Sequence, residues 1–340
     1  MNAYWMELAG DVGYDPNKKA VRDAIYGCEL VAAAVVMFDF FTWLGKAPAD
    51  PDTIRTSWKL TERTTDVMLT LFSAMGLVEK RQDLFSLTEN AQHILGTLSE
   101  WYRDEAAFAK RPVHGVIREV LRTGKPAHWA KGEKPWTEMM KGELFARSFL
   151  KSMDSQGAYL APSAAAHLDL KEHRRLLDIA GGSGTYACHI VQKHPHIQAT
   201  VLEQSPVNSV TLEYIAARGC SGSVEVASGD IFSERFPEGY DVHFWSNALH
   251  DWDASTVRQL IAKSYDALPD GGMIAIHDSH LNREKTGPLP VANYSVFLMT
   301  STEGKCYSVA EIESFVTEAG FNQVIRQDTV LNHSIITAIK

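Results

Sequence analysis

The sequence predicts an α/β protein with two unlike parts, a mainly helical N-terminal region and a C-terminal half built on an open, mostly parallel sheet. From residue 174 onward, short apolar runs of strand length alternate with amphipathic runs of helix length. Before residue 170 the periodicity is helical almost throughout. The chain of 340 residues also exceeds the size at which single cores stop growing, about 250–300 residues. We therefore expect an N-terminal domain over 1–110, a helical connector over 111–170 and a sheet domain over 171–340.

The N-terminal domain is expected to consist of helices followed by a small hairpin. Residues 20–43 predict one buried helix, and residues 60–80 predict an amphipathic helix that stops near Gly76. Two short strands with a polar turn follow over residues 77–95, and Thr88 is suited to cap the next helix. Helices followed by a two-stranded wing are the layout of a winged-helix module.

In the sheet domain we expect parallel strands joined by helices on both faces. The expected strands are residues 174–180, 199–203, 223–230, 240–250 and 271–280, and the expected helices are 185–195, 206–219 and 254–268. The end of the chain differs, because a helix at 307–321 is followed by two strands with only a short turn between them. Such a hairpin is antiparallel, so the last strand, within 332–340, is expected to run against the others.

Composition and charge exclude several classes of protein. Hydrophobic residues make up 45% and charged residues 22%, which is typical of a globular protein. The net charge of −9 disfavours nucleic acid and anionic lipid as partners. The four cysteines are dispersed without a C-x-x-C pair, which favours free thiols in a reducing compartment. Because neither a secretion signal nor a bilayer-length apolar run is present, we expect a cytoplasmic protein without a membrane partner.

The strongest local feature is the glycine-rich turn after the first strand of the sheet domain. Gly181, Gly182 and Gly184 follow the strand that carries Asp178. Glycines permit a tight turn and a close ligand approach, and the helix N-terminus beyond them favours a negative group such as a carboxylate. The third glycine of the G-x-G-x-x-G dinucleotide pattern is absent, which disfavours a pyrophosphate site. A glycine-rich turn without a ligand is the plain alternative.

Two further acids fall at the carboxyl ends of the next two strands. Glu203 lies 19 residues after Gly184, where a carboxylate can accept hydrogen bonds from both ribose hydroxyls. Asp230 is followed by Ile231 and Phe232, so an acid that could accept from an adenine amine stands beside an apolar cover for the ring. Ligands of open α/β sheets bind at these strand ends.

Taken together, these features resemble the class I S-adenosylmethionine-dependent O-methyltransferases. The matching segments are Asp178-x-Ala-Gly-Gly-x-Gly184, Glu203, Gly229-Asp-Ile-Phe232 and Asn247-Ala-Leu-His-Asp-Trp-Asp253. The branch is that of plant caffeic acid and acetylserotonin O-methyltransferases and bacterial antibiotic-pathway enzymes. The resemblance implies a Rossmann-like sheet with an antiparallel last strand and an N-terminal winged-helix domain that forms a homodimer.

The resemblance also implies a role for individual residues. Glu203 would hold the ribose of the cofactor, and Asp230 and Phe232 the adenine, with Trp252 packing on it. His250 would be the catalytic base and Asp278 the acid that orients it. The family's second acid follows a Gly-Lys or Gly-Arg pair, where this chain has Cys306, with Glu303 nearby. The implied cofactor-binding residues are Asp178, Gly181, Gly182, Gly184, Glu203, Gln204, Asp230, Ile231, Phe232, Ser246, Asn247 and Trp252.

The chemistry of methyl transfer gives His250 a role that does not depend on the resemblance. A phenol has a pKa near ~10 and is mostly neutral at pH 7. Histidine, with a pKa near ~6.5, is the side chain suited to remove its proton near neutrality. A histidine that only packs between a strand and a helix is the plain alternative. His189, His194 and His196 lack partners for a metal set, so no metal is expected.

The acceptor pocket is less sharply defined by sequence. Met153, Asn293, Phe297 and Met299 are candidates for contact with an aromatic small molecule, as are Trp129 and Trp136. Methionine contacts aromatic rings favourably and adapts in shape, although such residues more often belong to a core.

Two other functions stay open at this point. The first keeps the cofactor but methylates nitrogen or carbon, or uses the cofactor for another reaction. The second is a winged-helix regulator with a small-molecule sensor, but residues 1–110 hold 11 Lys and Arg against 16 Asp and Glu. A DNA-reading helix prefers a basic face, so dimerisation is the expected role of this domain.

Overall fold

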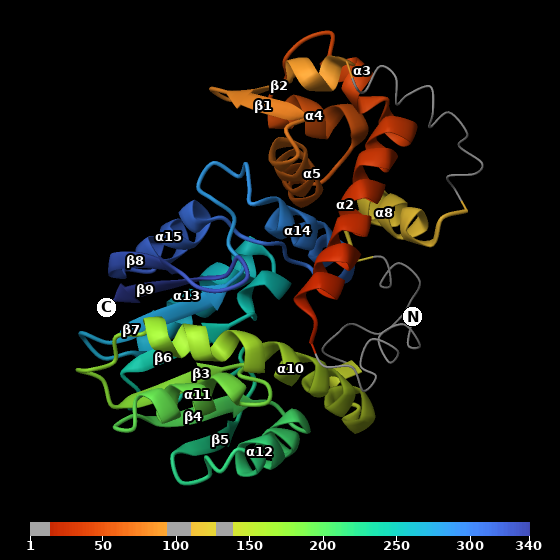
Figure 1. The fold of residues 1–340 in the computed structure, drawn as a ribbon. Helices are drawn as coiled ribbons and strands as arrows, with labels where there is room; N and C mark the ends of the chain where they lie inside the picture. The colour runs from red at the N-terminus through yellow and green to blue at the C-terminus, as the bar shows by residue number, and fades with distance from the viewer. Residues whose placement is uncertain (1–13, 94–109, 127–138) are drawn as a thin grey trace.

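The computed structural model describes residues 14–93, 110–126 and 139–340 (Figure 1). The helices and hairpin of the N-terminal region lie at one end of the molecule, and the large sheet with its helices lies at the other. The long helix α2 (Pro16–Phe38) begins beside the sheet domain and runs away from it into the N-terminal region. None of the helices in the described ranges combines the length and the apolar character that a bilayer-spanning segment needs.

The N-terminal elements follow the expected order with one correction. The helix expected over 20–43 is broken at Asp39 into α2 and α3 (Phe40–Leu44), because Asp39 adopts a left-handed conformation with φ 46°. Aspartate tolerates that region better than most residues. The remaining elements are α4 (Pro51–Trp58), α5 (Glu62–Ala74), β1 (Val78–Arg81) and β2 (Leu84–Leu87). β1 and β2 pair antiparallel, so the expected hairpin is confirmed.

Three features mark the limits of α5 and of the hairpin. Thr61 and Thr64 form a reciprocal capping box at the start of α5, and Gly76 takes a left-handed conformation just after its end. Thr88 Oγ1 accepts a hydrogen bond from the Ala91 N–H at 3.2 Å, as expected of a helix cap.

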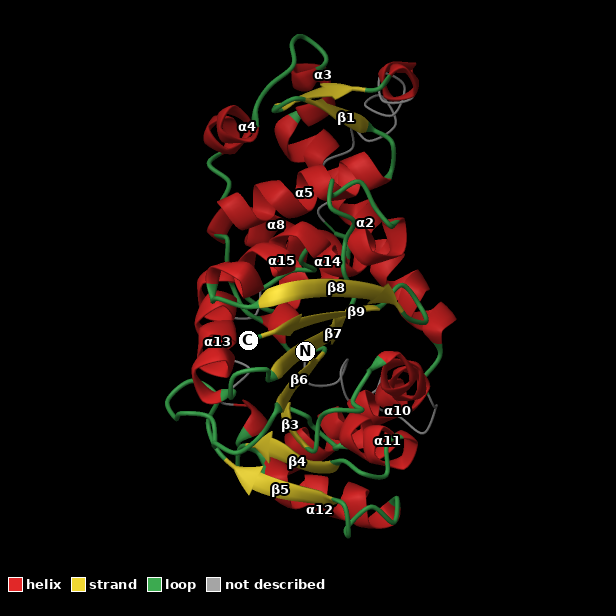
Figure 2. Ribbon diagram, turned by 90° about the vertical axis from the view of Figure 1, so that its left-hand side faces the viewer, coloured by secondary structure: helices red, strands yellow, loops and turns green. Residues whose placement is uncertain are grey.

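The connector forms two helices, α8 (Pro112–Thr123) and α10 (Glu143–His167). α10 continues nearly to the expected end of the connector at residue 170 and lies beside the first helix of the sheet domain (Figure 2). The insert that interrupts the connector, with Trp129 and Trp136, lies outside the described residues.

The sheet domain has seven strands in the order β5-β4-β3-β6-β7-β9-β8. The five strands from β5 to β7 are parallel, and β9 runs antiparallel to both of its neighbours, which confirms the expected direction of the last strand. The strands are β3 (Arg175–Ile179), β4 (Gln198–Glu203), β5 (Val224–Ser228), β6 (Val242–Ser246), β7 (Met273–Asp278), β8 (Asn322–Asp328) and β9 (Ser334–Ile339).

Helices cover both faces of this sheet (Figure 2). α10, α11 (Thr185–Lys193) and α12 (Val207–Ala217) lie on one side, and α13 (Ala254–Ala267) and α15 (Val309–Glu318) lie on the other. Strand side chains alternate between the two apolar clusters, so Leu176 faces α11 whereas Leu177 faces α13. The same alternation turns His277 away from Asp278: His277 contacts Thr329 and Asp278 contacts His250.

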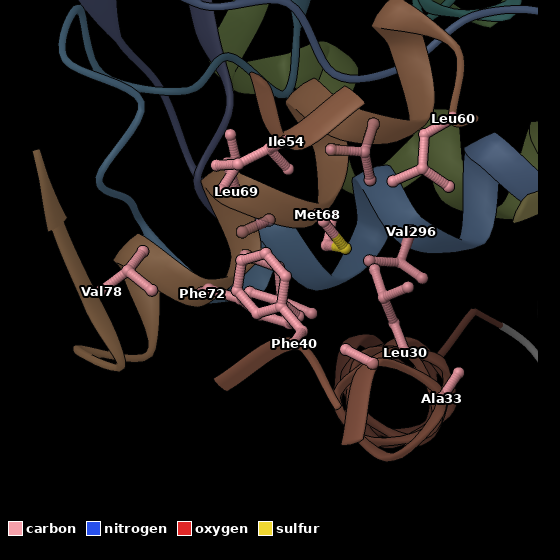
Figure 3. Close-up of a cluster of buried hydrophobic side chains, with 14 of the residues drawn as sticks. Leu30, Ala33, Phe40, Ile54, Leu60, Met68, Leu69, Phe72, Val78 and Val296 are labelled. Atoms are coloured by element: carbon pink, nitrogen blue, oxygen red, sulfur yellow. The ribbon is translucent and has the colours of Figure 1, made fainter. Parts of the chain in front are cut away.

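The helix α14 (Leu289–Ser301) was not expected from the sequence, and it joins the two parts of the molecule. Its residues are apolar on nearly every side, which is typical of a helix buried all round. Val296 packs with Leu30, Met68 and Phe72 in the N-terminal core (Figure 3). α14 therefore follows the sheet strands in sequence but completes the core of the N-terminal region in space.

Polar contacts reinforce this junction. The Arg63 guanidinium on α5 donates to the carbonyls of Thr302 (2.8 Å) and Gly304 (3.0 Å), just beyond the end of α14. Asp66, on the next turn of α5, pairs with Lys305 and Lys285 of the sheet domain. These contacts connect α5 of the N-terminal region to the loops before and after α14 in the sheet domain.

Candidate active site

The glycine turn lies at the carboxyl end of β3, directly over a buried acid. Gly182 and Gly184 have φ values of 60° and 72°, which a residue with a side chain rarely adopts. A Cβ on Gly181 would stand 2.5 Å from the Asp178 carboxyl carbon, so that position has no room for a side chain. Burial raises the pKa of Asp178 to about 8, and neither carboxylate oxygen has a hydrogen-bond partner of normal geometry in the described chain.

Glu203, at the end of β4, contacts the glycine turn that follows β3. Its two carboxylate oxygens accept hydrogen bonds from the N–H groups of Gly182 (2.9 Å) and Gln204 (3.1 Å). Burial raises the pKa of Glu203 to about 7, and these two hydrogen bonds act against the rise. The turn and Glu203 therefore form one unit, in which a backbone N–H of the turn fixes the carboxylate.

The end of β5 supplies an aromatic edge to this unit. Asp230 accepts hydrogen bonds from the Phe232 N–H (2.9 Å) and the Ser233 hydroxyl (2.8 Å), which keep its pKa below the usual range. Phe232 is 43% exposed and packs edge to face on Trp252, with 4.7 Å between ring centroids. The carbonyl of Ile231 accepts a hydrogen bond from Lys263. The exposed ring of Phe232 thus lies beside the Asp230 carboxylate, where a planar nucleobase could stack.

The side chain of Asn247, after β6, forms hydrogen bonds to other side chains of the protein. Asn247 has φ 47°, its amide donates to the Tyr186 hydroxyl at 2.9 Å, and its Oδ1 accepts from His333 at 3.2 Å. Ser246 beside it is buried. These hydrogen bonds link the β6 end to α11 and β9.

His250 lies in a short 3₁₀ turn, η2 (Leu249–Asp251), beyond the end of β6. Its Nδ1 is 2.6 Å from Asp278 Oδ1, and both side chains are almost fully buried. Burial alone would lower the pKa of His250, but the charges of Asp278 and Asp251 outweigh it and raise that pKa. Burial alone would raise the pKa of Asp278, but His250 lowers it to about 2. The structure therefore brings together the sequence-predicted base and its orienting acid.

The other nitrogen of His250 faces two residues that sequence reasoning did not include. Nε2 is 3.4 Å from the hydroxyl of Tyr294, on α14, and 3.7 Å from Asp251 Oδ1. Burial raises the pKa of Asp251 to about 6. Asp251 could have been found as the residue directly after the histidine, whereas no local signal points to Tyr294.

Glu303 and Cys306 lie on either side of Gly304, but in different surroundings. Burial raises the pKa of Glu303, and its charge lies near Asp253 and Arg63. Cys306 is fully buried, and burial raises the pKa of its thiol well above the usual range. The carboxylate that faces Nε2 is that of Asp251.

Of the four residues expected at the acceptor pocket, one lies on α10 and three lie on α14. Met153 is half-buried on α10, and Met299 is fully buried in the N-terminal core, where it exposes no surface to a ligand. Asn293 faces Gly27 of α2 so closely that a Cβ there would stand 2.0 Å from its Oδ1. Phe297 packs under Arg22 and Tyr26 of α2. Helix α2 therefore covers the face of α14 nearest to His250.

Within residues 14–93, 110–126 and 139–340, no three His, Cys, Asp or Glu side chains come together as metal ligands would. His194 and His196 instead each contact a backbone carbonyl, of Ala165 and Leu170 respectively.

Comparison with known proteins gives consistent matches. Residues 116–322 match the model of the O-methyltransferase domain family. The chain is 31% identical over 284 residues to 3-hydroxy-5-methyl-1-naphthoate 3-O-methyltransferase of Streptomyces sahachiroi, covering 82% of each chain. It is 29% identical to L-tyrosine C(3)-methyltransferase of Streptomyces lavendulae, covering 77% of this chain and 75% of the relative. An O-methyltransferase family 2 protein from Planctomyces limnophilus, solved with apigenin, superposes with a TM-score of 0.84 at 28% identity over 96% of this chain and 95% of that one.

Proposed function

The chain belongs to the O-methyltransferase family, and on that premise we propose that it methylates a hydroxyl of an aromatic small molecule with His250 as general base. Its cofactor is S-adenosylmethionine, which becomes S-adenosylhomocysteine. The observation that carries the proposal is the buried His250–Asp278 pair, 2.6 Å apart, at the end of the central strands. The substrate class is supported by the naphthoate relative and by the neighbour solved with apigenin.

The residues around the glycine turn fit this cofactor. When bound, S-adenosylmethionine supplies an electrophilic methyl group on a positively charged sulfonium. Asp178, buried without a hydrogen-bond partner in the described chain, and the glycine turn would hold the methionyl part, which bears an ammonium group. Glu203 would accept from the ribose hydroxyls, and Asp230 from the adenine amine. The exposed Phe232 ring, together with Trp252, would pack on the adenine.

His250 prepares the acceptor by moving a proton. Asp278 accepts from Nδ1–H, so the lone pair of the neutral imidazole is on Nε2, where it can take a phenol proton. The same carboxylate stabilises the imidazolium that forms. General bases of this kind contribute roughly 10²–10⁴-fold to rate. Holding both reactants in line for attack adds a further contribution from orientation.

Methylation of carbon is the second candidate, because one relative is an L-tyrosine C(3)-methyltransferase. His250 would serve that reaction too, since a deprotonated phenol activates the neighbouring ring carbon. The two reactions differ in product: a methyl ether leaves no free phenol, whereas a C-methyl product keeps it.

We also propose that the protein is a cytoplasmic homodimer, held together through its N-terminal domain (1–110). The connector (111–170) would contribute to the acceptor pocket, and the sheet domain (171–340) would bind the cofactor. The acidic balance of residues 1–110 supports dimerisation over DNA binding.

A methyl-transfer screen with isotope-labelled S-adenosylmethionine tests the proposal. The purified protein is incubated with phenols, hydroxyquinones, indoles and N-heterocycles, and products are identified by mass spectrometry. We expect labelled methyl ethers of phenolic acceptors. The His250→Asn variant keeps a polar group near the position of Nδ1 but none at the position of Nε2, so it is the matched control and should form almost none. Label found only on N-heterocycles, or undiminished turnover in the variant, would refute the assignment.

A further inference from the structure

The hydroxyl of Tyr294 lies within hydrogen-bond distance of His250 Nε2, the atom proposed to accept the substrate proton. The Tyr294 hydroxyl is 3.4 Å from His250 Nε2, and the two rings pack edge to face with centroids 5.6 Å apart. Because Asp278 takes the Nδ1–H, Tyr294 is the donor and Nε2 the acceptor. The donor on Nε2 is therefore the same chemical group as the proposed substrate.

Helix α2 holds this ring in place. The Lys19 ammonium lies 3.3 Å from the centroid of the Tyr294 ring and is bonded to Asp23 at 3.0 Å. Tyr294 also stacks with Phe297 of its own helix, with ring planes 13° apart, and Phe297 is covered by the Arg22 guanidinium of α2. The first turns of α2, far from α14 in sequence, thus hold Tyr294 directly through Lys19 and indirectly through Phe297.

The surroundings of Tyr294 do not suit it to take part in proton transfer. Burial, chiefly, together with nearby acidic groups, raises the pKa of Tyr294 well above its usual range. It therefore remains a neutral phenol at any pH where the enzyme would work, and toward the Nε2 lone pair of a neutral His250 it is the donor. Its 3.4 Å separation from Nε2 is long for an O–H···N hydrogen bond, so the contact is weak and another donor can replace it.

We propose that Tyr294 is a built-in placeholder for the acceptor: its hydroxyl holds Nε2 in the free enzyme, and the substrate hydroxyl must displace it. The proposal rests on the proposed function, in which His250 is the base. Tyr294 is then a positioning residue. It keeps the imidazole aimed at the acceptor site before substrate arrives, and binding of the acceptor competes with it.

The test is Tyr294→Phe, which keeps the ring and removes only the hydroxyl. We expect the KM of the acceptor to fall by roughly 2- to 10-fold with kcat nearly unchanged, because only one weak hydrogen bond no longer has to be broken. Tyr240→Phe is the matched control, since it removes a buried phenol hydroxyl that bonds Thr200 away from the site, and it should leave KM unchanged.

A second readout needs no substrate. The groups that face His250 are Asp251 from its own turn, Asp278 from β7, Tyr294 from α14 and Lys19 from α2, with His280 and His333 behind Asp278. A donor on Nε2 favours the neutral imidazole, so its loss should raise the pKa of His250. Histidine NMR of the free enzyme should show this rise, by a few tenths of a unit, in Tyr294→Phe and not in Tyr240→Phe.

The outcomes separate the two proposals. A fall in kcat of tenfold or more in Tyr294→Phe, or an unchanged KM with an unchanged His250 titration, would overturn the placeholder role. Full turnover in His250→Asn would instead overturn the proposed function, whatever Tyr294→Phe shows. The NMR titration still reports on the Tyr294–His250 contact in that case.

Discussion

The two halves of the candidate site are built in different ways. The cofactor half, around Asp178, Glu203 and Asp230, comes from one continuous stretch, in which the carboxylates of Glu203 and Asp230 accept hydrogen bonds from backbone N–H groups of the same stretch. The acceptor half gathers Lys19, His250, Asp278 and Tyr294 from four elements far apart in the chain. The comparison teaches that a site can have one part determined locally and another determined only by how distant helices pack.

The largest effect expected is on the acceptor half. His250→Ala should lower kcat by roughly 10²–10⁴-fold, because the phenol loses its base, while cofactor affinity stays nearly the same. Steady-state rates and calorimetric titration with S-adenosylhomocysteine would separate the two quantities. Equal losses in turnover and in cofactor affinity would mean that the two halves are not independent.

The complementary change is in the cofactor half. Glu203→Ala should weaken cofactor binding by about 1–3 kcal/mol, roughly 5- to 150-fold, because charge-assisted hydrogen bonds to the ribose are lost. Calorimetry measures this directly, and Glu225→Ala on β5, an exposed acid, is a suitable control. Unchanged affinity would remove Glu203 from the ribose site.

The affinity for S-adenosylmethionine should depend on pH through two carboxylates of the cofactor half. Asp178 and Glu203, with pKa values raised to about 8 and about 7, are partly protonated in the free enzyme at neutral pH. A sulfonium and an ammonium favour the ionised carboxylates, so binding releases protons and affinity rises with pH. The rise is up to about tenfold per pH unit for each proton released, and it ends above the free-state pKa values.

Calorimetry in two buffers of different ionisation enthalpy counts the protons. S-adenosylhomocysteine lacks the sulfonium charge and should release fewer. Binding of S-adenosylmethionine that is independent of pH between about 6 and 8 would show that these carboxylates do not respond to the cofactor charge.

The smallest effect expected is at the junction that holds the acceptor half together. Lys305→Met leaves Asp66 with Lys285 alone and should cost about 1 kcal/mol of unfolding free energy, since Asp66 and Glu311 remain partly exposed. Chemical denaturation measures it, and Lys171→Met, at an exposed ion pair with Asp169, is the control.

The sign of the pH dependence at this junction follows from the acids. The lysines lower the pKa values of Asp66 and Glu311, so the stabilisation is present above the unfolded pKa values, near ~4, and is lost as pH falls through the folded ones. The difference between Lys305→Met and the parent should therefore vanish in acid. A difference that persists there would point to lost packing of the lysine chain.

Sequence reasoning located most of the sheet domain, because each strand and helix there carries its own periodicity and each turn its own glycine or cap. It failed at two places. The single helix expected over 20–43 ends at Asp39, whose left-handed backbone has no clear sequence signal, and α14 was not predicted because a helix apolar on all sides has no amphipathic pattern. His250 and Asp278 were both identified from sequence, but their 2.6 Å contact depends on the pairing of β6 with β7.

The residues alone predicted the order of strands and helices along the chain, the antiparallel last strand and the acids and glycines of the cofactor half. Periodicity, turns and caps act within a few residues of each position, and the one longer link in this half, from Gly182 to Glu203, joins the ends of the paired strands β3 and β4. Tertiary packing alone brings α14 into the N-terminal core, Lys19 of α2 onto the Tyr294 ring and the Tyr294 hydroxyl onto His250. The physical reason is that burial of an all-apolar helix favours contact without specifying the partner, and only the packed whole supplies one.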